Sequence, residues 1–303
     1  MHIAILDTDV PVPAVYSTRG LYSTQFRTLL QAAANRLNAR NDSKIDIQTS
    51  AYDAVGGVLP PFNRLRTSEN HNNNNDNKEL DDQDIIDGIL ITGSANASYQ
   101  KDTKPWIANL EVFIREVYER FPAVRMFGSC FGHQIIAQAL FPGVLNVEQC
   151  PLGHEFGIVP ITLDDAFNES FPHIADSLRQ RNQQRFRLQL VHGDRVVPVN
   201  NNADGVKLRS PWFNLGYTEK CPIHGLYNPR RVLTYQGHFE FDAFVNRESC
   251  VEFGRRLGWD KDAVEGLVQQ INVALPAAGE GKEDDDDDSK AAAEAVVLLF
   301  AGR

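Results

Sequence analysis

The sequence lacks the segments that would place it in or across a membrane. It has no run of about 18 apolar residues, the length needed to cross a bilayer. Its first residues, MHIAILDTDVPV, have no basic flank, long apolar segment or small-residue cleavage site of the kind found in secretory signals. We therefore expect a cytoplasmic protein, or one that enters the nucleus, with no membrane partner.

Cysteine and basic residues are also scarce. The four cysteines, Cys130, Cys150, Cys221 and Cys250, form no C-x-x-C pair, so neither a disulfide framework nor a metal site is expected. Lys and Arg number 30 against 40 Asp and Glu, a formal net charge of -10, which argues against a nucleic-acid partner. No G-x-x-x-x-G-K-[ST] motif is present to bind phosphate, and we expect no cofactor.

Two polar stretches interrupt a chain of 303 residues that is otherwise rich enough in apolar residues, at 42%, to build a full core. The Asn-rich stretch 66–84 is typical of a solvated surface insertion. The acidic run 280–290 repels itself, which predicts disorder. We expect one domain over residues 1–276 and an acidic, unanchored tail over 277–303. The alternative is that the last residues, AAAEAVVLLFAGR, form a helix that docks on the body or on a partner.

The first half of the chain alternates short apolar runs with segments of helical spacing. Strands are expected at 2–7, 45–54, 85–94 and 123–129, and helices at 21–39, 104–121 and 131–141. This order predicts an α/β fold with a mainly parallel central sheet flanked by helices, in which binding groups collect at the carboxyl ends of the strands. The later segments 145–163, 186–197, 205–210 and 231–241 predict more strands, with antiparallel or mixed pairing, and two closing helices follow at 242–259 and 260–275.

Cys130 lies where a predicted strand turns directly into a predicted helix, with Gly128 and Gly132 two positions to either side. This is the arrangement of a nucleophile elbow with Cys in place of Ser. Small flanking residues permit the sharp turn, and the helix start places N–H groups and a positive dipole beside the sulfur. The alternative is a buried structural thiol, and the G-x-C-x-G pattern alone does not exclude it.

A thiol nucleophile needs a base and a group that orients the base. His238 follows the apolar run RVLTY at the end of a predicted strand, and Glu240 stands two residues later on the same side of an extended segment. Glu240 could therefore fix the tautomer of His238. With eight histidines in the chain, an equally simple interpretation is a solvated His beside a surface Glu.

Taken together, GSCFGHQIIA and the downstream QGHFEF resemble the class I, triad-type glutamine amidotransferases. The segments DGILITGSANASY, LGHEFGI and LQLVHGDRV are also similar to segments of that family, in the same order. The resemblance extends over most of residues 1–255. It implies a flavodoxin-like amidotransferase fold and strengthens the interpretation of Cys130 as a nucleophile.

The resemblance implies a role for each matching position. Cys130 would attack the side-chain carboxamide of glutamine, His238 would pass the proton to the departing nitrogen, and Glu240 would orient His238. The backbone N–H groups of Phe131 and of Gly93 or Ser94 would hold the oxyanion. Glutamine itself would be contacted by Gln134, His192, Gly193 and Asp194, with Asp194 placed to receive the α-amino group.

This chain departs from the family in two respects. Phe239 stands where Pro is common between the His and the Glu, and no synthetase segment follows to accept ammonia. Three functions stay open. The first is a Cys-His-Glu hydrolase of glutamine or another γ-glutamyl amide, closest to γ-glutamyl peptidase-like and fungal-type members. The second is a glutaminase subunit that delivers ammonia to a separate synthetase partner. The third is a regulatory module that kept the fold.

Overall fold

The computed structural model describes residues 1–41, 44–67, 84–172, 175, 185–200, 208–273 and 288–303. Most of the Asn-rich stretch and most of the acidic run lie outside these residues, so the expectations for them stay predictions.

A seven-stranded sheet runs through the middle of the molecule. Its order is β2 (Gln48–Asp53), β1 (His2–Asp7), β3 (Gly88–Ile91), β4 (Arg125–Ser129), β12 (Val232–Tyr235), β11 (Leu226–Asn228) and β9 (Phe213–Asn214). The first five strands pair in parallel, and β11 and β9 add antiparallel pairs at one edge. β1, β3 and β12 are buried along their whole lengths, as expected of strands covered on both faces. The predicted mainly parallel α/β sheet is confirmed.

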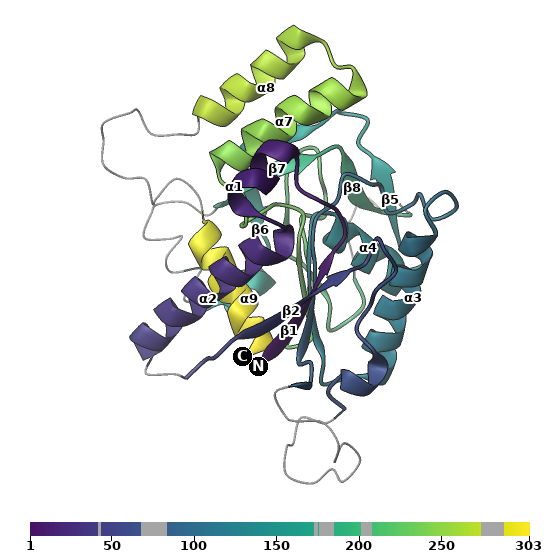
Figure 1. Ribbon diagram of the computed structural model, residues 1–303, viewed down its shortest axis with the longest axis vertical. Coiled ribbons are helices and arrows are strands. Elements are labelled where there is room, and N and C mark those ends of the chain that lie inside the picture. The colour runs from purple at the N-terminus through teal and green to yellow at the C-terminus, as the bar shows by residue number, and fades with distance from the viewer. Residues whose placement is uncertain (42–43, 68–83, 173–174, 176–184, 201–207, 274–287) are drawn as a thin grey trace.

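Helices cover both faces of this sheet (Figure 1). Side chains of α2 (Tyr22–Asn41) and α9 (Ser289–Phe300) form one core with Ile3 and Ile5 of β1. Those of α3 (Pro105–Arg120) and α4 (Phe131–Leu140) form a second core with Ala4 and Leu6. Successive residues of β1 therefore serve opposite layers, which is the alternation of a strand between two helical layers.

The later strands form a second, antiparallel part of the fold. β6 (Glu155–Leu163) pairs with β7 (Arg185–His192) and with β10 (Gly216–Tyr217), and β5 (Leu145–Gln149) pairs with β8 (Asp194–Pro198). The helices α1 (Pro13–Arg19), α7 (Ala243–Leu257) and α8 (Lys261–Val273) lie at this end of the molecule (Figure 1). The short elements η1 (Phe62–Arg64) and α5 (Asp165–Ser170) complete the described structure. The expected antiparallel and mixed pairing is confirmed.

The strand predicted at 205–210 is wrong for residues 208–210, while 205–207 lie outside the described residues. Pro211 follows this segment and has no N–H to donate to a ladder. The N–H of Trp212 instead closes a turn by donating to the carbonyl of Arg209 at 2.9 Å.

The prediction of an unanchored tail is wrong for residues 289–300. They form α9, which packs beside α2 on the central sheet (Figure 1) and contributes seven buried apolar residues to the first core: Ala292, Ala293, Ala295, Val296, Val297, Leu299 and Phe300. The docking alternative therefore holds for this segment. The apolar side chains of α9 hold this segment on the core, although the acidic run just before it predicted a disordered tail.

One ionic contact fixes α9 against its neighbour. Glu294 of α9 accepts hydrogen bonds from Arg36 and Arg40 of α2, each at 2.7 Å. The carboxylate is only 9% exposed, so this pair lies at the edge of the core and is less screened than a surface pair. It complements the apolar packing and sets which face of α9 meets α2.

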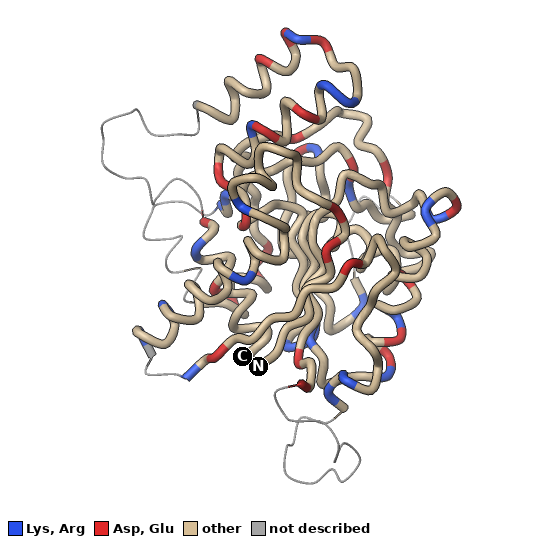
Figure 2. The backbone as a smooth tube through the Cα atoms, viewed as in Figure 1, with Lys and Arg blue, Asp and Glu red and all other residues tan. Residues whose placement is uncertain are grey.

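Charged residues otherwise lie mainly on helices and loops around the sheet (Figure 2). In the part of the chain that the structure describes, no helix is both long enough and apolar enough to cross a membrane. The apolar helix α9 has 12 residues, and its hydrophobic side chains pack into the protein core.

Leu299→Ala should lower the free energy of unfolding by about 2–5 kcal/mol, because a fully buried side chain of α9 would be replaced by a cavity. Leu257→Ala is the matched control, since Leu257 is 65% exposed at the end of α7, and it should change stability by less than about 0.5 kcal/mol. Urea unfolding of both variants measures the difference. Equal effects would show that α9 is not part of the folded core.

Candidate active site

Cys130 lies on the turn between β4 and α4 in a backbone conformation that side chains rarely adopt. Its φ is 50° and its ψ is -104°, and in the described part of the chain only Arg230 shares a positive φ among residues other than glycine. Such a conformation costs about 1–3 kcal/mol and persists only where the surrounding structure enforces it. The predicted strand-to-helix elbow is therefore present in the geometry.

The two flanking glycines allow this turn because the backbone is crowded there. A Cβ on Gly128 would overlap the carbonyl of Gly132, and a Cβ on Gly132 would overlap the carbonyl of Ile91 on β3. The N–H of Cys130 donates to the carbonyl of Tyr235 on β12 at 2.8 Å. Three adjacent strands therefore fix the position of the sulfur, which is nearly buried.

His238 and Glu240 meet as the spacing predicted. Nδ1 of His238 lies 2.7 Å from Oε1 of Glu240, and the same oxygen accepts a hydrogen bond from Ser129 Oγ at 2.9 Å. Both side chains are almost completely buried, which removes the interpretation of a solvated pair. Since Ser129 directly precedes Cys130, one carboxylate connects the histidine to the elbow.

The charge on His238 is favoured by its neighbours. Burial lowers the pKa of His238, but the negative charge of Glu240 and then contact with Cys130 outweigh burial and raise this pKa to about 10. The imidazole ring stacks on Phe241 with a centroid distance of 4.0 Å and an interplanar angle of 5°. The ring of His238 is thus held in one orientation beside Cys130.

Phe239 lies between His238 and Glu240, at the position where the family commonly has Pro. Its ring is buried and makes edge contacts with Phe26 and Tyr235 and a tilted contact with Phe127 in the first core. The N–H of His238 also donates to the carbonyl of Gln189 on β7 at 2.8 Å. Packing and one backbone hydrogen bond therefore restrain this segment where a proline ring would otherwise do so.

Gly93, a predicted oxyanion-hole residue, lies directly against Cys130 and His238. A Cβ on Gly93 would lie 3.0 Å from His238 Cε1 and 3.7 Å from Cys130 Cβ. The carbonyl of Gly93 accepts a hydrogen bond from the Thr8 hydroxyl at 3.0 Å. In a trans peptide the C=O and the next N–H point in opposite directions, so this bond fixes the orientation of the Ser94 N–H as well.

Asp9 holds the turn that follows. Its Oδ2 accepts hydrogen bonds from the Ser94 hydroxyl at 3.1 Å and from the Ala95 N–H at 2.8 Å. Phe131, which carries the second predicted N–H donor, is the first residue of α4 directly after Cys130. Thr8 and Asp9, at the carboxyl end of β1, are thus the groups that set the geometry of the Gly93–Ser94 turn.

The residues predicted to contact glutamine form a separate group beside the elbow. The Gln134 amide donates to the carbonyl of Asp194 at 3.3 Å, and Nδ1 of His192 lies 3.1 Å from that same oxygen. Gly193 is crowded by the ring of His154. Burial raises the pKa of the Asp194 carboxyl, and a hydrogen bond from Tyr99 opposes this shift.

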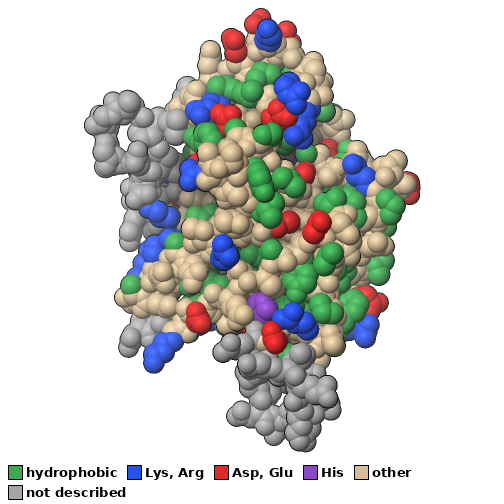
Figure 3. Space-filling model, viewed as in Figure 1, with side chains coloured by type: hydrophobic (Ala, Val, Ile, Leu, Met, Phe, Trp, Pro, Cys, Tyr) green, Lys and Arg blue, Asp and Glu red, His purple; other side chains and the backbone are tan. Residues whose placement is uncertain are grey.

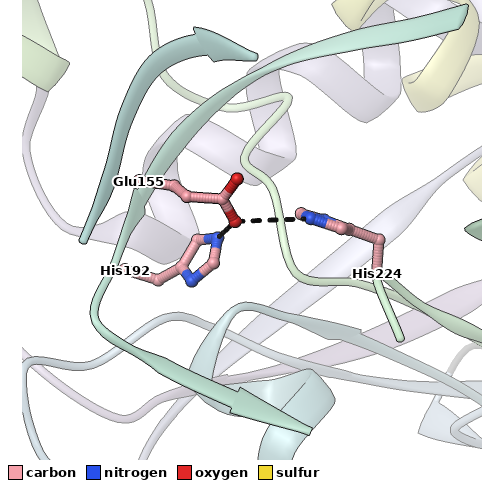
Figure 4. Close-up of side chains that lie close together, drawn as sticks. All are labelled: Glu155, His192 and His224. Carbon is pink, nitrogen blue, oxygen red and sulfur yellow. Dashed lines mark ion pairs between the residues drawn. The ribbon is translucent and has the colours of Figure 1, made fainter. Parts of the chain in front are cut away.

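His192 is backed by a buried pair that the sequence did not reveal (Figure 4). Its Nε2 lies 3.3 Å from Glu155 Oε2, and Nε2 of His224 lies 3.6 Å from the same oxygen. Burial raises the pKa of Glu155, but the two histidines outweigh it and hold it well below its ordinary value. The carboxylate oxygen of Glu155 and the ring nitrogens of His192 and His224 lie within 4.8 Å of one another, close enough to bind one metal ion. The Thr218 hydroxyl contacts both Glu155 and His224, whereas Nε2 of His192 has no hydrogen-bond partner among the described residues.

A cavity opens at Cys130 on the His238 side. It is open to solvent, its enclosed part has a volume of about 30 Å³, and Cys130, His238, Gly93 and Ser94 are among the residues that line it. Its walls come from the segment after β1, the start of α2 and the inner face of α7. The four predicted glutamine-contacting residues are not in its lining.

Comparisons with known proteins agree on the family. A Schizosaccharomyces pombe protein named as glutamine amidotransferase-like is 30% identical over 274 residues, which cover 90% of this chain and 93% of that protein. A Saccharomyces cerevisiae protein named as a candidate glutamine amidotransferase is 33% identical over 168 residues, or 54% of this chain and 57% of that one. No family model matches the sequence.

Solved structures share the fold at lower identity. A glutamine amidotransferase from Thermotoga maritima superposes with a TM-score of 0.58 at 13% identity, covering 99% of this chain and 98% of that one. One from Methylobacillus flagellatus gives 0.52 at 17% identity, covering 99% and 92%. These similarities concern the architecture alone.

The pKa of His238 is directly measurable by NMR titration of isotope-labelled histidine and should be near 10. Glu240→Gln should lower it, because Glu240 is the largest of the influences that raise it. A raised pKa also means that His238 contributes stability that is present below pH 6.5 and is lost as the pH rises towards 10. The control is Glu119→Gln, a change at an exposed position on α3. An unshifted His238 in the Glu240 variant would contradict the pairing.

Proposed function

This chain belongs to the glutamine amidotransferase-like family, and on that premise we propose that it hydrolyses a γ-glutamyl amide through a γ-glutamyl thioester on Cys130. The observation that carries the proposal is the buried His238–Glu240 pair beside a strained elbow cysteine. This is the geometry of a nucleophile, a base and an orienting carboxylate.

In the first step the sulfur of Cys130 attacks the γ-carbonyl carbon of the substrate. The ring of His238, whose pKa is raised, lies in contact with the sulfur and carries the proton that the departing nitrogen needs. The S–C bond forms, the C–N bond breaks, and the proton on His238 passes to the departing nitrogen. Glu240 keeps the ring in one orientation throughout.

The oxyanion of the tetrahedral intermediate would be held by the backbone N–H groups of Phe131 and Ser94. Phe131 is at the N-terminus of α4, where the N–H groups have no partner within the helix. The Ser94 N–H is oriented by the hydrogen bond of Thr8 to the Gly93 carbonyl. Both donors are backbone groups fixed before the substrate arrives, which is what makes such sites effective.

The glutamyl end of the substrate would lie on the Gln134 and Asp194 side of the elbow. Asp194 offers a half-buried carboxylate for the α-amino group, and Gln134 and His192 hold the Asp194 backbone in place through its carbonyl. Glu155 and His224 act behind His192 and position it.

In the second step water cleaves the thioester and releases glutamate. This step returns the thiolate and the protonated His238.

Cys130→Ser should lower steady-state hydrolysis of glutamine and γ-glutamyl dipeptides by at least about 1,000-fold, since the nucleophile acts as a unit with its base. Cys150→Ser is the control, because Cys150 is buried elsewhere and should leave the rates unchanged. Release of glutamate from each substrate is the readout. Hydrolysis that survives in Cys130→Ser would exclude the thioester route.

Thr8→Val should lower kcat by about tenfold or more with little change in KM, because the hydroxyl acts through the Ser94 N–H, which binds the oxyanion only in the transition state. Thr8→Ser keeps the hydroxyl and should restore most of the rate. A thermal melt separates this effect from unfolding. Equal losses in the Val and Ser variants would mean that Thr8 serves packing alone.

A further inference from the structure

The cavity beside Cys130 is open to solvent, so a leaving group larger than ammonia can extend out of it. Its lining runs from Cys130 and His238 to Ser249, Phe253 and Arg256 on one face of α7. The enclosed part, about 30 Å³, has room for one or two molecules of the size of water. The rest of a leaving group of amino-acid size would therefore lie along this lining towards solvent.

The position of His238 determines which part of the substrate enters this cavity. His238 gives its proton to the departing nitrogen, so that nitrogen must lie on the His238 side of Cys130. His238 lines the cavity, whereas Gln134 and Asp194 do not. Any group attached to the nitrogen is consequently directed into the cavity, and the glutamyl part is directed away from it.

The inner walls are apolar and largely aromatic. Phe241 stacks on His238, and Tyr22 stacks on Phe241 with a centroid distance of 6.0 Å and an interplanar angle of 24°. Val12 and Phe253 add aliphatic and aromatic surface. On the face of the molecule that Figure 3 shows, hydrophobic side chains are spread among polar and charged ones. Walls of this kind favour a leaving group with an apolar or aromatic side chain.

Besides His238, two charged residues line the cavity, Asp9 and Arg256, and they are not equally free to bind a substrate. The carboxylate of Asp9 already accepts hydrogen bonds from Ser94, Ala95 and Val10. Arg256 is about half exposed and donates to Glu252 through Nε at 2.8 Å. A guanidinium has five N–H donors, so Arg256 can still bind a carboxylate through its terminal nitrogens.

We propose that this cavity is a leaving-group subsite for an amino acid joined to the γ-carboxyl of glutamate, with an apolar side chain on the Tyr22–Phe241 wall and a free α-carboxylate at Arg256. The substrate class is then the γ-glutamyl dipeptide rather than free glutamine. This inference rests on the proposed function and adds the identity of the leaving group.

The test compares γ-glutamylphenylalanine with γ-glutamylphenylalaninamide, which lacks only the carboxylate charge, and with glutamine. Wild-type kcat/KM should be higher for γ-glutamylphenylalanine than for its amide by about tenfold to a hundredfold, the range expected for one charge-assisted contact. Arg256→Gln should abolish this preference while its turnover of the amide stays near that of the wild type. Arg255→Gln is the matched control, because Arg255 is the neighbouring arginine, also pairs with Glu252 and is not in the cavity lining.

The outcomes separate this inference from the proposed function. Cys130-dependent turnover with no preference for the carboxylate, or a preference that persists in Arg256→Gln, would overturn the subsite and leave the γ-glutamyl hydrolase in place. Turnover of glutamine alone would also overturn it, and would favour a glutaminase. If the folded protein cleaves none of the three, the proposed function fails and the subsite fails with it.

Discussion

The close approach of three backbone segments at Cys130 is the constraint on which the site depends. Gly128 on β4 meets Gly132 on α4, and Gly132 meets the carbonyl of Ile91 on β3. No side chain fits at either glycine. The tight turn between them holds Cys130 at a positive φ. The positions of Phe131, of Gly93 and of the sulfur all follow from this packing. The same crowding puts Ser129 within reach of Glu240.

Hydrogen bonds to backbone carbonyls extend this constraint outwards. Thr8 fixes Gly93, Gln189 fixes His238, and Gln134 with His192 fixes Asp194. In each case a hydrogen bond to a backbone carbonyl holds a group near Cys130 in place. The residues that make these bonds lie in the segment after β1, on α4 and on β7. Cys130 lies between two differently built sides, one polar around Asp194 and one apolar around Phe241.

The sequence predicted those features that depend on local pattern. Buried runs such as residues 2–7 and 123–129, and the glycines around Cys130, identified the parallel sheet and the elbow, and a two-residue spacing paired His238 with Glu240. Contacts between distant segments could not be predicted from the sequence. Thr8 reaches Gly93 only because β1 and β3 are neighbours, and Glu155 reaches His224 across the second sheet. The apolar end of the chain was misjudged because the acidic run before it dominated the composition, although α9 buries Leu299 and Phe300 completely or nearly so. Arg256, one of two adjacent arginines, had no signal that distinguished it from Arg255.

The central claim is that Cys130 carries a γ-glutamyl group during the reaction. Intact-mass spectrometry of the protein, quenched with acid a short time after mixing with a γ-glutamyl substrate, tests it most directly. The account predicts a transient mass increase of one γ-glutamyl group, located on Cys130 by peptide mapping, absent from Cys130→Ser and present in Cys150→Ser. Substrate turnover by the wild type with the label on another residue, or with a γ-glutamyl adduct that also forms in Cys130→Ser, would contradict it.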